Sequence, residues 1–338
     1  KISRAGKEVL KLAEQCSIPV INTFNGIGSV PFDHANSFGT LSRMGTSLAK
    51  ELLEDSDLLV AVGNSLNGVS TKRWTFDLPD QLIQIDTDPT NINKHYPVSI
   101  GLVSDAKTAV NGLFKYIEQE LDSTLQQSRE KRLEYWRKKK TEWLNKTFAY
   151  GTEQPLKPQT VIQALGQHAD PDTVWVFDAG NPGIWSHLLN IKEDQAYMKC
   201  VGFGNMGFSV PAAIGAKMAD QNRPVVAVVG DGSLGMSLGE LSTIVAQKLP
   251  ITVIVMNDQA YGNIKQEELW HFGAPRYIAV DLEDIQFADV AKACGGDGER
   301  VRTYEELIQA LEKAQKSESL YVIDIIIDGE VSVWEKLF

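Results

Sequence analysis

Two short apolar segments in the second half of the chain end in residues that can bind a metal ion and a phosphate. Residues 225–229 precede Gly230-Asp231-Gly232-Ser233, and residues 251–256 precede Asn257-Asp258. Both segments are typical of buried strands in a parallel sheet, and residues 238–247 between them are expected to form a helix. Parallel strands end at the same edge of a sheet, where open α/β sheets bind their ligands. The pattern therefore predicts a ligand site at the ends of these two strands.

Asp231 and Asp258 are 27 residues apart, but both follow strand ends and are expected to lie close together. Hard cations such as Mg²⁺ prefer carboxylate oxygens, and Gly230 and Gly232 let backbone N–H groups approach a phosphate. An isolated Asp-Gly pair is equally typical of a tight turn. The full order of strand, turn, helix, strand and Asn-Asp favours a Mg²⁺ ion that bridges a diphosphate.

These two motifs resemble the thiamine-diphosphate signature of the acetolactate synthase and pyruvate oxidase superfamily, and the resemblance extends through nearly the whole chain. It implies an α/β protein with two doubly wound parallel-sheet domains, a thiamine-diphosphate-binding fold and a Rossmann-like middle domain. It also implies that Asp231, Asp258 and the carbonyl of Ala260 bind Mg²⁺. Asp258 replaces the usual second Asn of the family, so its charge should raise cation affinity, partly offset by repulsion of the diphosphate.

Further residues match positions that hold the cofactor in this family. Met206 would pack beneath the two rings and force the bent shape of the cofactor, and Gly204 would offer its carbonyl to the aminopyrimidine. A polarizable thioether suits packing against heteroaromatic rings, although a lone Met is more often a core residue. Gly180 and Asn181 follow a predicted strand at 173–177 and could either bind the diphosphate or simply cap a helix. The remaining cofactor positions are Gly230, Gly232, Ser233, Tyr261, Gly262, Asn263 and Ile264.

A dinucleotide-binding motif is the main alternative. Residues 202–207 fit G-x-G-x-x-G, and Asp231 follows Gly207 by 24 positions. Against this interpretation, segment 197–201 contains Lys199 and is a poor buried strand, and the predicted helix 210–218 resembles the thiamine family better. An NAD- or FAD-binding redox protein and a non-catalytic binding module stay open as alternatives. FAD in the middle domain is not favoured, because the loop 63–68 has no Arg before Arg73.

Composition limits the class of partner. A net charge of −11 argues against nucleic acid, whose phosphates would repel the chain. The sequence has no apolar run of membrane-spanning length and no recognisable signal peptide. Cys16, Cys200 and Cys294 lack metal-ligand spacing and are expected to be reduced. We therefore expect a cytoplasmic protein without nucleic acid or membrane partners. The resemblance implies a small-molecule 2-oxo acid or aldehyde as its substrate.

Three regions are expected along the chain. Residues 1–121 form the middle domain, with helices at 6–16 and 46–55 and strands at 19–23, 58–62 and 82–85. This domain is expected to be truncated, because the family's middle domain opens with a strand before its first helix. Residues 122–155 form a charged helical linker, which is expected to be solvated rather than a binding patch. Residues 156–338 form the thiamine-diphosphate- and Mg²⁺-binding C-terminal domain.

The resemblance implies a thiamine-diphosphate- and Mg²⁺-dependent carbon–carbon lyase or carboligase that acts on pyruvate or a related 2-oxo acid as a homodimer or homotetramer, like acetolactate synthase. The substrate stays open: residues 261–267 are closer to pyruvate oxidase, while 203–205, 235–237 and 269–270 resemble sulfoacetaldehyde acetyltransferase. Glu267, where acetolactate synthases typically have Trp, is the candidate on the substrate side. The family's activating glutamate lies in a preceding domain, so we expect the chain alone to fold but to be inactive.

Overall fold

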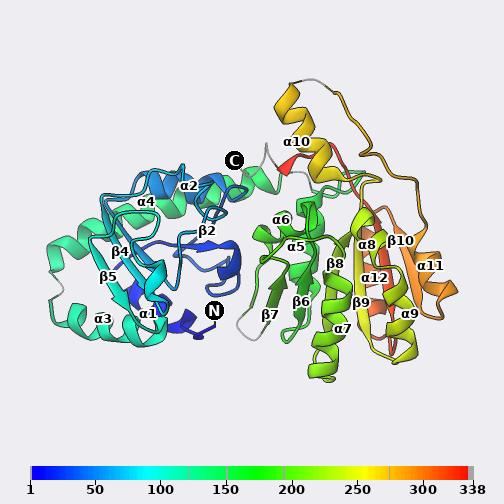
Figure 1. Ribbon diagram of the computed structural model, residues 1–338, viewed down its shortest axis with the longest axis horizontal. Helices are drawn as coiled ribbons and strands as arrows, with labels where there is room; N and C mark the ends of the chain where they lie inside the picture. Colours follow the sequence, from blue (N-terminus) through cyan, green and yellow to red (C-terminus); the bar gives the residue numbers. More distant parts are fainter. Residues whose placement is uncertain (1, 121, 150, 193–194, 274, 334–338) are drawn as a thin grey trace. The chain divides into compact units, whose positions relative to one another are not determined.

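The computed structural model describes residues 2–120, 122–149, 151–192, 195–273 and 275–333. These residues fall into two compact units, Lys1–Lys146 and Thr147–Phe338, each of which is described by itself (Figure 1). Both units are α/β and all their paired strands are parallel, as predicted. No helix in the described ranges is both long and apolar enough to cross a membrane.

The first unit contains two small parallel sheets. β1 (Val20–Thr23) pairs with β2 (Ser37–Leu41), and β4 (Gln81–Asp86) pairs with both β3 (Leu58–Val62) and β5 (Ile100–Val103). The helices of this unit are α1 (Gly6–Gln15), α2 (Ser47–Glu54), α3 (Ala106–Glu120) and α4 (Ser123–Thr147), with 3₁₀ turns η1 (Phe24–Gly26) and η2 (Pro89–Asn91). The expected strands and helices form, whereas β2, β5 and α3 were not predicted.

Helix α4 corrects the prediction of a solvated linker. Leu133 and Trp136 are buried in a cluster with Phe38, Leu48 and Leu52, all in the first unit. Lys140 is also buried, and its ammonium donates to the carbonyls of Phe32 at 2.8 Å and His34 at 2.9 Å. Burial lowers the pKa of Lys140 to about 8. The prediction was wrong for this face, because the surrounding charges obscured a buried stripe at helical spacing.

Replacing Trp136 with Ala is therefore expected to destabilise the first unit by about 3–5 kcal/mol, as in other large-to-small core substitutions. The indole also donates to Asp55 Oδ2 at 3.0 Å, and that bond would be lost. Urea unfolding followed by far-UV circular dichroism measures the change. Tyr135→Ala, at the exposed neighbouring position, is the control and should cost much less. Equal losses for both variants would show that α4 is not part of this core.

The second unit is built on a six-stranded parallel sheet of order β10-β11-β9-β8-β6-β7. The strands are β6 (Val174–Phe177), β7 (Ala196–Lys199), β8 (Val225–Gly230), β9 (Ile251–Asn257), β10 (Asp297–Val301) and β11 (Tyr321–Ile326). The predicted strands β6, β8 and β9 are neighbours, so their carboxyl ends do share one edge. This adjacency brings three loops of the predicted site together.

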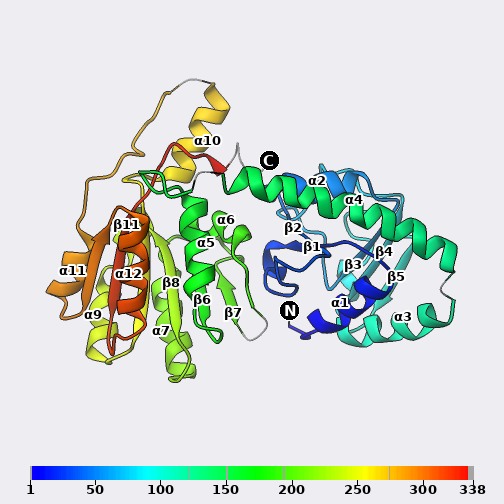
Figure 2. The same cartoon turned by 180° about the vertical axis from the view of Figure 1, so that it is seen from behind.

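Helices cover both faces of this sheet. One core cluster joins the sheet to α7 (Ser209–Ala219), α9 (Gly239–Ala246) and α11 (Phe287–Ala293), while α5 (Pro158–His168) and α12 (Tyr304–Ala314) lie on the opposite face (Figures 1 and 2). Four further elements, α6 (Asn181–Trp185), η3 (Ser186–Leu188), α8 (Asp231–Met236) and α10 (Gly262–Phe272), complete the description of this unit. Three of them, α6, α8 and α10, begin in loops of the predicted site.

The strand before the glycine motif lies at the edge of the sheet. Segment 197–201 is expected to be a poor buried strand, and Ala196–Lys199 does form β7 and pair in parallel with β6, but only Tyr197 of its four residues is buried. β7 lies at the edge of the sheet, so Tyr197 is buried while Met198 is exposed. The strand before a dinucleotide-binding glycine loop is instead a central strand of its sheet. The edge position of β7 therefore adds to the argument against a dinucleotide-binding motif.

Candidate cofactor and metal site

Asp231 is the first residue of α8, immediately after the end of β8. Its side chain is 5% exposed, and within the described residues its Oδ2 has no hydrogen-bond partner. Burial raises the pKa of this carboxyl to about 6. A buried carboxylate oxygen without a partner is costly, and a bound cation would satisfy it.

Asp258 follows the end of β9 and lies close to Asp231. Burial and the negative charge of Asp231 together raise the pKa of Asp258 to about 7. Hydrogen bonding to the backbone of Ala260 acts on both carboxyl groups and opposes the rise. The structure thus brings together the three positions proposed to bind a metal. The described residues contain no group of three or more His, Cys, Asp and Glu side chains that could hold a metal. A cation between these two aspartates would need further oxygens, from a backbone carbonyl or a bound diphosphate.

The start of α6 joins the same site. Gly180, with φ of +76°, is the residue before this helix, and Asn181 begins it. A Cβ on Gly262 would overlap Asp258 Oδ2 and lie 3.0 Å from Asn181 Nδ2, so both side chains press against the backbone of Gly262. Asn181 Oδ1 and Asn263 Oδ1 are buried and, like Asp231 Oδ2, have no partner among the described residues. Buried polar atoms are rarely left unpaired, so these oxygens are candidates to bind a polar ligand.

Glycines make this approach of the loops feasible. A Cβ on Gly232 would lie 2.5 Å from the ring of Tyr261, and one on Gly230 would lie 3.8 Å from Pro182. Ser233 is buried in α8 behind Asp231. Gly230, Gly232, Tyr261 and Gly262 therefore line the contacts between α6, α8 and α10. Their roles in cofactor binding stay predictions.

The glycine loop 202–207 is attached to the site through Asp178, whose importance the sequence analysis missed. This fully buried carboxylate at the end of β6 accepts hydrogen bonds from the backbone N–H groups of Gly207 at 3.0 Å and Ser209 at 2.7 Å. A Cβ on Gly207 would be 3.8 Å from the carbonyl oxygen of Ser233, so the end of the loop lies against α8. Gly204, with φ of +77°, and the half-buried Met206 precede this anchor.

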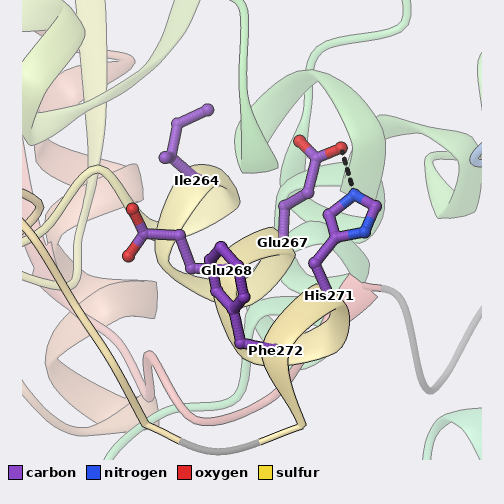
Figure 3. A pocket seen from close by; sticks show the side chains of 5 residues that line it. All are labelled: Ile264, Glu267, Glu268, His271 and Phe272. Atoms are coloured by element: carbon purple, nitrogen blue, oxygen red, sulfur yellow. Dashed lines mark ion pairs between the residues drawn. The ribbon is translucent and has the colours of Figure 1, made fainter.

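Two predicted residues, Ile264 and Glu267, lie on another face of α10. With Glu268, His271 and Phe272 they line an open pocket of about 440 Å³ (Figure 3). Glu267 Oε1 is 3.6 Å from His271 Nε2, and Figure 3 shows the two side chains turned toward each other. The opposite residue, Gln266, is buried and donates to the carbonyl of Gly329 at 3.1 Å. Ile264 and Glu267 therefore line this pocket, and the structure does not place them with Asp231 and Asn181.

Lys199 is a second residue whose environment the sequence did not predict. Its ammonium donates to the carbonyl of Gly183 in α6, and burial lowers its pKa to about 7. Gly183 is two residues after Asn181 in the same helix. The hydrogen bond of Lys199 therefore connects β7 to α6 next to the site.

The raised pKa values of the aspartates predict a pH dependence of stability. In the unfolded chain both carboxyls titrate near the ordinary value of 3.8, so between about pH 4 and 7 the folded protein binds more protons than the unfolded one. These two carboxyls should therefore lower the free energy of unfolding of the cofactor-free protein as the pH rises through this window, relative to a variant that lacks their charges. The size should be about 1–3 kcal/mol, and Asp231→Asn/Asp258→Asn should remove it. Urea unfolding of both proteins at pH 5 and pH 8 measures the difference. These pKa shifts would be contradicted if, from pH 5 to pH 8, the free energy of unfolding fell no more in the wild type than in the double variant.

Comparison with known families extends these observations to the whole chain. Residues 178–325 match the family described as "Thiamine pyrophosphate enzyme, C-terminal TPP binding domain". Residues 1–113 match "Thiamine pyrophosphate enzyme, central domain". The chain belongs to the thiamine pyrophosphate enzyme family. Thiamine pyrophosphate is the same compound as thiamine diphosphate, so the predicted family is confirmed.

Individual relatives agree with this family assignment. The chain is 32% identical over 334 residues to the "Putative thiamine pyrophosphate-containing protein YdaP" of Bacillus subtilis (strain 168), covering 97% of this chain and 56% of that protein. It is 30% identical over 348 residues to an "Acetolactate synthase" of Mycobacterium bovis, covering 98% and 54%. A "Probable acetolactate synthase large subunit" of Methanocaldococcus jannaschii is 30% identical over 346 residues, covering 97% and 56%. The chain thus spans just over half the length of these relatives.

Proposed function

We propose that this chain is the diphosphate- and metal-binding part of a thiamine-diphosphate- and Mg²⁺-dependent carbon–carbon lyase or carboligase that acts on pyruvate or a related 2-oxo acid. The observation that supports this most is the buried Oδ2 of Asp231, which has no hydrogen-bond partner among the described residues and lies beside Asp258 at the ends of two adjacent strands. Mg²⁺ takes oxygen ligands and usually completes its shell with substrate phosphates. The buried Oδ1 of Asn181, whose amide lies beside Gly262 and Asp258, supports a polar ligand larger than a lone ion.

The residues present fit the cofactor in a definite way. Asp231, Asp258 and the carbonyl of Ala260 would hold Mg²⁺, and Gly180, Asn181, Gly232 and Ser233 would hold the diphosphate. When bound, thiamine diphosphate supplies a carbon nucleophile that adds to a carbonyl and stores the electrons released as CO₂ departs. The protein contributes orientation: Lys199 and Asp178 fix the two loops beside the site, and Tyr261 covers the backbone of Gly232. Correct placement of this kind is a large part of catalysis.

The names of the relatives favour acetolactate synthase-like chemistry, in which the same donor adds to a second 2-oxo acid. The pocket on α10 differs from the expected pattern for that chemistry, because Glu267 stands where a Trp is typical. Its pairing with His271 favours a substrate with a polar end. Pyruvate oxidase-like or acetyltransferase chemistry on the same donor is therefore the second candidate. A homodimer or homotetramer, in which a second copy completes the site, is part of the proposal.

Product analysis tests this function. The chain should be assayed with pyruvate, thiamine diphosphate and Mg²⁺, beside a protein extended by the domain that precedes the central domain in the resembling family. We expect the extended protein to consume pyruvate and release CO₂ only with both cofactors, and the 338-residue chain to be inactive. General acid–base groups contribute about 10²–10⁴ in rate, so the difference should be readily measured. Pyruvate consumption at the same rate with and without thiamine diphosphate would contradict the proposal.

A further inference from the structure

Asp324 is a fully buried carboxylate in β11, at some distance from the expected metal ligands along the chain. In the parallel pairing of β11 with the edge strand β10, the partner of Asp324 is Arg300. Arg300 Nε donates to Asp324 Oδ2 at 2.7 Å, and the backbone N–H of Phe287 donates to the same oxygen at 3.3 Å. One carboxylate oxygen is therefore neutralised from the outer side of the sheet.

The other oxygen of Asp324 faces the site. Asn257, the last residue of β9, donates from Nδ2 to Asp324 Oδ1 at 2.9 Å. Its Oδ1 accepts a hydrogen bond from the backbone N–H of Gln259 at 3.1 Å. Both ends of this buried amide are thus used, and they connect the ion pair to the loop that holds Asp258 and Ala260.

Gln259 is the strained point of that loop. Its φ is +54°, in the left-handed region, where a non-glycine residue costs about 1–2 kcal/mol. The two residues beside it, Asp258 and Ala260, are the two proposed metal ligands of this loop. Any relaxation of Gln259 would rotate the carboxylate of one and the carbonyl of the other. The bond from Asn257 opposes this relaxation on one side, and the bond from Leu282 N–H to the carbonyl of Gln259, at 2.8 Å, does so on the other.

Arg300 is itself held firmly. Its Nη1 lies 2.8 and 3.0 Å from the two oxygens of Asp284, and its Nη2 donates to the carbonyl of Ile285 at 2.6 Å. A planar guanidinium with this many partners has a fixed orientation. Replacing a buried ion pair by apolar residues is often neutral for stability, so stability alone does not explain a buried pair at this position.

We propose that Arg300, acting through Asp324 and Asn257, is a positioning residue that fixes the 258–260 loop and thereby sets the affinity of the metal site. This inference rests on the proposed function, because it takes Asp258 and Ala260 as ligands. Groups that orient metal ligands typically change metal affinity by about 10–100-fold when they are removed. Arg300 touches neither ligand, so an effect of this size would have to travel along the hydrogen-bonded series.

Mn²⁺ titration of the chain in the presence of thiamine diphosphate tests the proposal, with free Mn²⁺ measured by electron paramagnetic resonance. Arg300→Met should weaken Mn²⁺ binding by about 10-fold or more, and Arg300→Lys, which keeps the charge beside Asp324, should restore most of it. Asn257→Ala breaks the series next to the loop while leaving the ion pair intact, and should weaken binding similarly. It also keeps the test decisive if Arg300→Met does not fold.

Tyr321→Phe is the matched control. It removes a hydrogen bond to Glu299 across the same two strands at their other end, and Mn²⁺ affinity should not change. Hydrogen exchange of a peptide covering residues 257–263 gives a second measurement without metal, and should be faster in Arg300→Met and Asn257→Ala than in Tyr321→Phe. Wild-type Mn²⁺ affinity and exchange in both variants would overturn the inference. A wild-type chain that binds no Mn²⁺ would instead overturn the proposed function, whatever the exchange rates.

Discussion

Replacing Asp231 with Asn is expected to abolish Mg²⁺-dependent binding of thiamine diphosphate while making the cofactor-free protein more stable at pH 8. The substitution keeps the size of the side chain and removes its charge. Asp231 and Asp258 are the two carboxylates expected to bind Mg²⁺, and removing one charge removes a large part of the attraction for the cation. We expect the affinity for the cofactor with Mg²⁺ to fall by at least about 100-fold.

The opposite effect on stability has the same cause. Burial and neighbouring charge raise the pKa values of Asp231 to about 6 and Asp258 to about 7, so at pH 8 the ionised pair destabilises the empty site. Removal of one charge should therefore raise the melting temperature of the cofactor-free protein. Asp289→Asn is the control, since it makes the same change at an exposed position on α11. An unchanged cofactor affinity in Asp231→Asn would refute the assigned role of this residue.

Gly262→Ala is the second variant with a large expected effect. Its Cβ would overlap Asp258 Oδ2 and crowd Asn181 Nδ2 at 3.0 Å. The overlapping atom is the end of a side chain and can move away, so the free energy of unfolding should fall by about 1–3 kcal/mol, as at other overpacked positions. The displaced carboxylate would no longer face Asp231, so Mg²⁺-dependent cofactor binding should weaken by about 10-fold or more.

Gly235→Ala provides a matched comparison for this variant. Gly235 lies in α8, and a Cβ there would meet nothing within 4 Å. Alanine is the better helix former by up to about 1 kcal/mol, so this variant should be slightly more stable and bind cofactor normally. In a background of Asp258→Ala, Gly262→Ala should have little further effect on binding, because the two changes act on one group. Additive effects would show that Gly262 acts by another route.

The central part of the second unit could be predicted because local pattern and tertiary environment agree there. β6, β8 and β9 are apolar, short and buried on both faces, and turn residues end each of them. The motif predicted that the ends of β8 and β9 share one sheet edge, and therefore that Asp231 and Asp258 lie close together. The predicted turn at 230–233 is in fact the start of α8. Glycines have a low helix propensity, and tertiary packing overrides it here.

Other features depend on contacts that sequence spacing does not encode. Strands β2 and β5 are four or five residues long and lack clear alternation. The buried face of α4 is interrupted by charges, and Lys140 occupies one of its buried positions. Asp178, Asp324 and Arg300 were not recognised, because their partners are distant in sequence and become neighbours only through strand pairing. The convergence of Asn181 and Asp258 on Gly262 likewise needs the folded chain.

Titration calorimetry with thiamine diphosphate, in the presence and absence of Mg²⁺, tests the central claim most directly. The claim is that the unpaired oxygens between α6, α8 and α10 form a metal-dependent diphosphate site. The account predicts saturable binding of thiamine diphosphate with Mg²⁺, at least about 10-fold weaker binding when the metal is chelated, and no binding of NAD or FAD under the same conditions. Binding of NAD without any response to thiamine diphosphate and Mg²⁺ would contradict the account.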